Sequence, residues 1–235
     1  ASGDGSLWVA SEGAGSVDDP DRPVTSNNVL VHAAADGDIM ATVALPASVN
    51  EKQRRFGFEG VASVMEGDNE VLYVAFQRAW IGDPEPDNVA DGGKVRIGRY
   101  NTDTGDWTFA YYPLDVRESP NEGWVGLSEI TALGGDEFAV LERDNQAGPD
   151  ARIKKVYKFS VTGVAFKADG EAFETVSKTL VDDLMDDLQA PNGLVLEKVE
   201  GMTVLPDGTT LVVNDNDGVD DSNGETQLLR IDGLF

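Results

Sequence analysis

Short runs of alternating apolar and polar residues recur along this chain, each introduced by a turn that contains Gly or Asp. Alternation with a period of two is typical of β-strands that bury one face. Four of these runs end in a polar or acidic residue and return roughly every 70 residues, which indicates an internal repeat. They occupy residues 4–13, 69–78, 136–145 and 207–217.

A second repeated element precedes three of these strands and centres on a glutamate, namely Glu59, Glu129 and Glu200. A third element follows each strand, with alternating residues and turns such as Asp-Gly and Thr-Gly that suit hairpins. Each repeat therefore predicts four antiparallel strands. Tandem four-stranded units are typical of a β-propeller, so the expected fold class is all-β, with about four repeats visible.

The first repeat lacks the glutamate element that precedes the other three. A blade that begins at residues 4–13 leaves an open strand edge, which natural sheets avoid. We therefore expect residues 1–235 to form a single propeller domain truncated at its N-terminus. The complete ring is expected to have five or six blades, with a further chain or segment completing it.

One stretch departs from the strand pattern. Across residues 179–189, Leu180, Leu184 and Leu188 recur at helical spacing with aspartates between them. A short helix or turn on the propeller rim is the prediction for this stretch.

Charge and composition narrow the possible partners. The 235 residues contain 18 Lys+Arg and 43 Asp+Glu, a formal net charge of -25. This balance disfavours nucleic acid and anionic lipid. No apolar run reaches the length of a membrane helix. Cysteine is absent and His32 is the only histidine, so thiolate chemistry and histidine-rich zinc sites are excluded.

The repeated glutamates are candidate metal ligands. If equivalent positions of successive blades converge, Glu59, Glu129 and Glu200 form a ring of carboxylates whose mutual repulsion a cation would offset. Oxygen ligands from several blades suit calcium. Asp215 and Asp217 belong to an acidic run that could add ligands, although it fails the EF-hand register. In the alternative interpretation, each glutamate only accepts backbone N–H groups of its own blade.

Candidate residues for anion chemistry lie close to these elements. Glu142, Arg143 and Asn145 end the third repeated strand, and the planar guanidinium fork of an arginine binds phosphate or carboxylate. Glu142, Arg143 and Glu200 are the candidate catalytic residues. Arg54, Arg55 and Asn145 are the candidate substrate-binding residues. An ion pair that joins neighbouring blades is the alternative role for Arg143.

The stretches around these residues, notably 55–62, 127–133, 138–145 and 199–217, resemble the phytase-like family described as esterase-like activity of phytase. The resemblance extends from about Leu7 to Leu229. It implies a β-propeller that works outside the cytoplasm, in an extracellular or periplasmic setting, and hydrolyses phosphoesters or other esters.

Two functions follow as expectations. The first is a calcium-dependent phosphoester hydrolase that acts on a small anionic substrate at the channel mouth, with the cation polarising the phosphoryl oxygen and a glutamate as base. The second is a non-catalytic, calcium-stabilised propeller that binds a ligand or a protein partner as a module of a larger extracellular protein.

Overall fold

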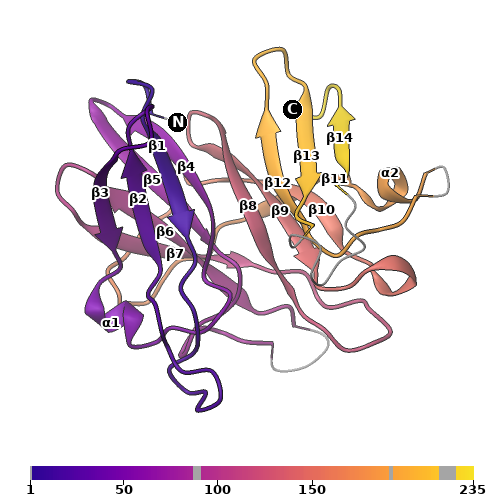
Figure 1. Ribbon diagram of the computed structural model, residues 1–235, viewed down its shortest axis with the longest axis horizontal. Helices are drawn as coiled ribbons and strands as arrows, with labels where there is room; N and C mark the ends of the chain where they lie inside the picture. The colour runs from indigo at the N-terminus through magenta and orange to yellow at the C-terminus, as the bar shows by residue number, and fades with distance from the viewer. Residues whose placement is uncertain (1, 87–90, 191–192, 217–225) are drawn as a thin grey trace.

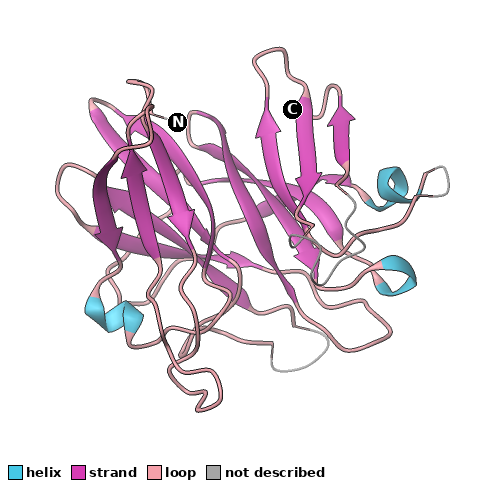
Figure 2. Ribbon diagram, in the orientation of Figure 1, coloured by secondary structure: helices cyan, strands magenta, loops and turns pink. Residues whose placement is uncertain are grey.

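The computed structural model describes residues 2–86, 91–190, 193–216 and 226–235. These residues form four antiparallel sheets of three or four strands, with two short α-helices and one 3-10 turn (Figures 1 and 2). The prediction of an all-β fold is therefore confirmed. None of the described helices is long and apolar enough to cross a membrane.

Strands follow one another in chain order within every sheet. The first sheet contains β1 (Leu7–Ser11), β2 (Val29–Ala33) and β3 (Ile39–Ala44). The second contains β4 (Phe58–Glu66), β5 (Asn69–Phe76), β6 (Lys94–Asn101) and β7 (Trp107–Pro113). The third contains β8 (Val125–Gly134), β9 (Glu137–Asp144), β10 (Lys154–Ser160) and β11 (Lys178–Asp183). The fourth contains β12 (Val199–Val204), β13 (Thr210–Asn214) and β14 (Leu228–Ile231).

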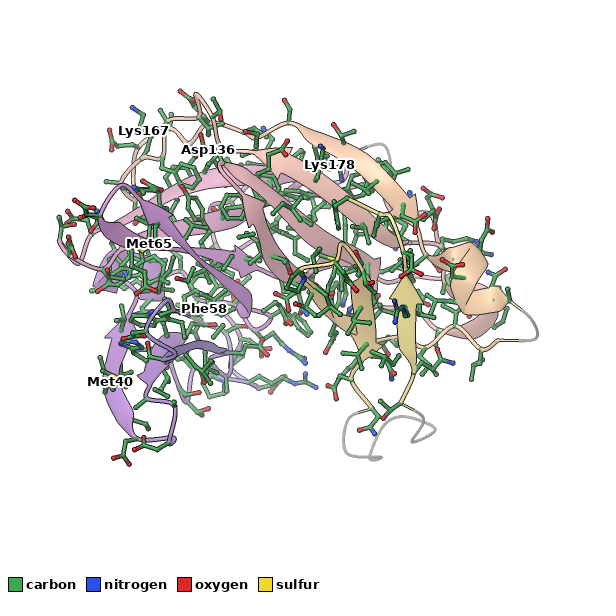
Figure 3. All side chains as sticks on the ribbon, turned by 90° about the horizontal axis from the view of Figure 1, so that it is seen from above. Met40, Phe58, Met65, Asp136, Lys167 and Lys178 are labelled. Atoms are coloured by element: carbon green, nitrogen blue, oxygen red, sulfur yellow. The ribbon has the colours of Figure 1, made fainter. Side chains whose placement is uncertain are left out.

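Consecutive sheets pack face to face. β1 lies against β4, β4 against β8, and β8 against β12. Three apolar layers fill the spaces between the sheets. Figure 3 shows side chains filling these layers, with Phe58 inside and Met40 at the outer edge.

Strand β5 shows why the middle sheets are so apolar. Leu72 and Val74 enter the layer against the first sheet, while Val71 and Tyr73 enter the layer against the third. Both faces of the second sheet are therefore buried, and the alternation of apolar and polar residues gives way to a continuous apolar run. The third sheet shares this arrangement through β9.

The repeated strands predicted from the sequence correspond to β1, β5, β9 and β13, and the glutamate elements lie on β4, β8 and β12. The helix predicted over residues 179–189 is only partly present. Residues Lys178–Asp183 form β11, which pairs with β10, and the helix α2 is limited to Met185–Gln189. Pairing along the exposed edge of β10 outweighs the helical spacing of the apolar residues.

The connection from β10 to β11 reaches across to the second sheet. Single bridges join Lys167 to Phe109 and Thr175 to Tyr111, both on β7. Phe173 from the same connection packs against the rings of Phe109 and Tyr111. The connection therefore covers an edge strand that would otherwise present unpaired backbone groups.

A buried lysine joins the third and fourth sheets. The Nζ atom of Lys154 donates to Asp144 Oδ1 at 2.8 Å and to the carbonyl oxygens of Asp144, Gln146 and Glu197. The other oxygen of Asp144 accepts the N–H groups of Arg152 and Ile153. One ammonium group thereby connects the end of β9 to the segment that precedes β12.

Replacing this lysine is expected to be costly. Lys154→Met leaves the Asp144 carboxylate buried without its partner, so the free energy of unfolding should fall by about 3–5 kcal/mol. Lys158→Met on the same strand is the control, because its half-exposed pair with Glu137 contributes about 0–1 kcal/mol. Urea denaturation measures both variants. Equal midpoints would show that the Lys154 contacts do not stabilise the fold.

Candidate functional site

Two of the three repeated glutamates occupy β-bulges. The pairing register shifts at Glu59, between β4 and β5, and at Glu200, between β12 and β13. In β8 the shift falls one residue earlier, at Ser128, so that Glu129 stays in the ladder opposite Leu141. A bulge re-aims the side chain that it carries, and Glu129 consequently points differently from the other two.

The bulged glutamates meet Arg143 of β9. Arg143 Nη2 donates to Glu200 Oε1, and Glu59 lies within electrostatic range of Glu200, Arg143 and Glu12, which follows β1. We call Glu12, Glu59, Arg143 and Glu200 the glutamate–arginine cluster. Burial, followed by the charges of Glu200 and Glu12, raises the pKa of Glu59 to about 8.

Only one of the three guanidinium nitrogens of Arg143 donates a hydrogen bond within this cluster. Its side chain is 3% exposed. The Nε and Nη1 groups have no hydrogen-bond partner among the described residues, although Nη1 lies 3.9 Å from a carboxylate oxygen of Glu197. Buried guanidinium N–H groups normally find acceptors, so Arg143 retains capacity to bind one.

Glu129 lies apart from the cluster. Its Oε1 atom accepts the N–H of Ile130 at 2.7 Å, next to Gly60 of β4, where a Cβ would collide with it. Burial raises the pKa of Glu129 to about 7. The structure therefore brings two members of the predicted carboxylate ring together and leaves Glu129 between β4 and β8.

Glu142 is fully buried. Its carboxylate accepts from Tyr112 Oη at 2.9 Å, from the N–H of Asp115 at 2.6 Å and from Lys178 Nζ at 2.7 Å. Burial raises the pKa of Glu142, and the positive charge of Lys178 opposes this shift. With three donors and no exposed surface, Glu142 joins β7, β9 and β11 and does not face open space.

The remaining predicted residues have varied positions. Asn145 Oδ1 accepts the N–H of Trp124 at 2.8 Å and so fixes that residue. Arg54 pairs with both Asp18 and Glu85. Asp215 is exposed, with its carboxylate 4.0 Å from Lys198 Nζ. Asp217 lies outside the described residues.

The described part of the chain contains no group of three or more Asp, Glu or His side chains placed to hold a metal ion. Glu200 is paired with Arg143, Glu129 points elsewhere, and Asp215 faces Lys198. These donors do not fit the six to eight oxygens that calcium takes. Calcium binding stays a prediction.

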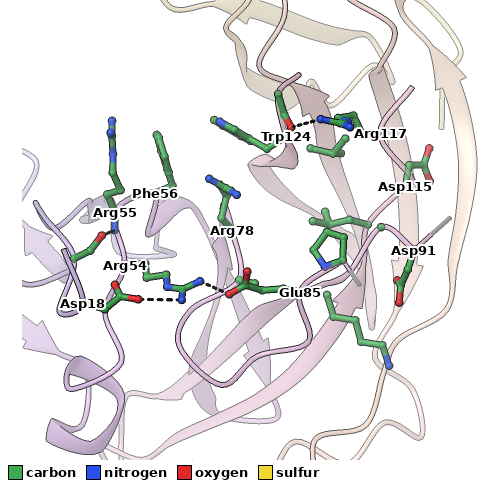
Figure 4. Close-up of a pocket in the computed structure, with 18 of the residues that line it drawn as sticks. Asp18, Arg54, Arg55, Phe56, Arg78, Glu85, Asp91, Asp115, Arg117 and Trp124 are labelled. Atoms are coloured by element: carbon green, nitrogen blue, oxygen red, sulfur yellow. Dashed lines mark hydrogen bonds and ion pairs between the residues drawn. The ribbon is translucent and has the colours of Figure 1, made fainter. Parts of the chain in front are cut away.

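A cavity of about 810 Å³ opens beside the glutamate–arginine cluster, at the loops before β4, after β5 and before β8. Figure 4 shows Arg55 and Phe56 toward one side of it, Arg117 toward the other, and Arg78 and Trp124 between them. We call it the arginine pocket. The guanidinium of Arg143 lies 5.3 Å from the Trp124 ring centre, which connects the pocket to the cluster.

Three guanidiniums of the pocket have no carboxylate partner among the described residues, namely those of Arg55, Arg78 and Arg117. Arg117 Nη1 reaches only the carbonyl oxygen of Gly123, at 3.5 Å. Burial lowers the pKa of Arg78, which nevertheless stays cationic at neutral pH. In a chain with 43 acidic residues against 18 basic ones, arginines without acidic partners indicate a place for an anion.

The acidic residues of the pocket are engaged elsewhere. Asp18 and Glu85 pair with Arg54, and Asp115 pairs with Lys155 and Lys178. Asp19 and Asp91, which also line the pocket, accept backbone N–H groups of their own loops, and the charge of Glu85 also acts on Arg78. None of these five carboxylates forms an ion pair with Arg55, Arg78 or Arg117.

Phe56, Arg78, Arg117 and Trp124 were not predicted from the sequence. The available signal was position: Arg78 is the last residue of a repeated strand run, and Phe56 and Trp124 lie shortly before the glutamate elements at Glu59 and Glu129. The sequence does not show that these loops meet, because they belong to different repeats.

The burial of Glu142 leads to a stability prediction. Glu142→Gln removes the charge that faces Lys178, so the free energy of unfolding should fall by about 1.5–3 kcal/mol. Glu137→Gln on the same strand is exposed and should change it little. Thermal or urea denaturation measures both. Equal stability of the two variants would contradict a structural role for Glu142.

Comparison with known proteins finds one family whose model matches most of the chain. The phytase-like family, described as esterase-like activity of phytase, matches residues 1–218. No curated protein and no solved structure matches the chain. The matched residues include β1 to β13, the glutamate–arginine cluster and the arginine pocket. The chain belongs to the phytase-like family.

Proposed function

We propose that this chain binds a phosphoester anion in the arginine pocket and hydrolyses it. The observation that carries this proposal is the set of three guanidiniums, Arg55, Arg78 and Arg117, that surround one cavity without acidic partners among the described residues. Several guanidiniums directed at one space favour a phosphoryl group, whose three terminal oxygens accept many hydrogen bonds.

The same side chains support hydrolysis. Preorganised cations around a phosphoryl group stabilise the charge of the transition state. In the adjoining cluster, Glu59 forms no hydrogen bond or ion pair with a described residue, whereas Glu200 is held by Arg143. Glu59 is therefore the proposed proton-transfer group, and Arg143 the proposed inner contact for the anion.

We also propose that the four sheets are blades of a β-propeller. Support comes from the chain-order strands within each sheet and from the contacts of β4 with β8 and of β8 with β12. Leu7 and Val9 are 46% and 48% exposed, although both are apolar strand residues. A further blade of a five- or six-bladed ring would cover them.

A non-catalytic propeller is the second candidate function. It is favoured by the full burial of Glu142 and by the pairing of Glu200 with Arg143, which leave few free carboxylates near the pocket. In that case the pocket binds an anionic ligand or an acidic partner without turnover. An extracellular or periplasmic setting is proposed on the family resemblance and the acidic composition.

Binding of inorganic phosphate tests the pocket. Arg78→Gln removes one charge-assisted contact, so the dissociation constant measured by calorimetry should rise about 10- to 100-fold. Arg99→Gln is the matched control, because Arg99 is paired with Glu66 outside the pocket. An unchanged dissociation constant in Arg78→Gln would rule out the pocket as the anion site.

Turnover of 4-nitrophenyl phosphate and of glycerol phosphate separates the two candidate functions. Glu59→Gln should leave phosphate affinity unchanged and lower kcat, most strongly for glycerol phosphate, whose alkoxide needs a proton on leaving. Phosphate binding without turnover in the wild type would favour the non-catalytic propeller.

Calcium and a chelator form a separate experiment. Because the guanidiniums themselves supply the positive charge, phosphate affinity should not change when a chelator is added. Phosphate affinity that depends on added calcium would instead support a bound calcium ion.

A further inference from the structure

Phe56 and Trp124 bring two loops of the arginine pocket into contact. Phe56 precedes β4 of the second sheet, and Trp124 precedes β8 of the third. Their ring centres lie 4.9 Å apart with the planes inclined at 43°. Both residues line the cavity (Figure 4).

Three guanidiniums lie over these two rings. Arg55 is 4.3 Å from the centre of the Phe56 ring. Arg78 lies between the rings, at 5.5 Å from Phe56 and 5.0 Å from Trp124. Arg143 is 5.3 Å from Trp124. These separations are within the range of cation–π attraction.

Arg55 and Arg78 contact the rings of Phe56 and Trp124 without a carboxylate, unlike another arginine of this protein that also lies over rings. Arg96 also lies over aromatic rings, those of Phe109 and Phe173, but it is paired with Asp83 at 2.8 Å. A carboxylate would neutralise a guanidinium, whereas a ring holds it and leaves its N–H edge and its charge available to an anion.

The backbone of Phe56 supports a functional role. Its φ of 69° is in the left-handed region, and Phe56 is alone among the described non-glycine residues in having a positive φ. Such a conformation persists only where the surroundings enforce it, and it is common at functional sites. Here Ser16 Oγ accepts the backbone N–H of Arg55, Glu12 Oε1 accepts the N–H of Gly57, and the Phe56 carbonyl accepts the backbone N–H of Arg78 at 3.3 Å.

The backbone of Trp124 is held by hydrogen bonds that do not involve Phe56 or its neighbours. Its N–H donates to Asn145 Oδ1 at 2.8 Å, and its carbonyl accepts the N–H of Asn145 at 3.1 Å. Phe56 is held by the loop after β1 and by the segment after β5, and Trp124 by the residue after β9, so the two rings meet only because the sheets pack.

We propose that Phe56 and Trp124 are positioning residues that hold Arg55 and Arg78, which have no acidic partner among the described residues, beside Arg143 for the oxyanion of the substrate. This inference rests on the proposed function. It explains how guanidiniums that repel one another remain side by side in a protein with a net charge of -25.

The test measures phosphate affinity by calorimetry together with the melting temperature. Phe56→Leu and Trp124→Leu should each weaken phosphate binding about 3- to 30-fold, the equivalent of losing one or two cation–π contacts. Phe56→Tyr keeps a ring and should bind within about twofold of the wild type. Phe173→Leu is the matched control, since it removes a ring beside the carboxylate-paired Arg96 and should not change affinity.

Phe56→Gly separates positioning from folding. Glycine adopts the left-handed region without strain, so the melting temperature should fall less than in Phe56→Leu, while phosphate binding weakens at least as much. Wild-type affinity in Phe56→Leu, with loss in Arg78→Gln, would overturn the role of the rings and leave the proposed function intact. Absence of phosphate binding by the wild type would overturn both.

Discussion

Face-to-face packing of consecutive sheets is the constraint on which the rest of this structure depends. The second and third sheets bury both faces, so their central strands carry apolar residues at successive positions, as in Val71–Phe76 of β5. Polar groups are consequently displaced to strand ends, bulges and connecting loops. The first strands of the second, third and fourth sheets, β4, β8 and β12, lie next to one another, so the strand ends that carry these polar groups converge. The glutamate–arginine cluster and the arginine pocket both form at this convergence.

Cations in this acidic protein have two kinds of surroundings. Lys154 and Arg96 are enclosed with carboxylates and backbone oxygens, so their charge is balanced and they join neighbouring segments of the fold. Arg55 and Arg78 contact aromatic rings and have no acidic partner among the described residues. A charge that is held but not neutralised is what an anion-binding site needs. These two groups of cations differ in their surroundings in the folded chain, which their positions in the sequence do not show.

Prediction from the sequence succeeded where a pattern was local and repeated. Alternating strands, hairpin turns and the glutamate elements appear as expected on successive sheets. It was less successful where contacts with residues of other repeats determine the position of a side chain. Glu129 leaves the expected ring because the bulge of β8 falls at Ser128, and Glu142 is enclosed by Tyr112 and Lys178 from other strands. The local pattern of apolar and polar residues shows neither a register shift nor a partner from another strand.

The sequence by itself determined the all-β class, the repeat, the excess of acidic residues and the family. These properties depend on alternation, composition and motifs, which are read within one stretch of chain. Only the tertiary structure decided which charges are paired. Phe56 and Trp124 belong to different repeats, and they meet over Arg78 because the second and third sheets pack together. Contacts between distant segments depend on that packing, so the arginine pocket could be recognised only in the folded chain.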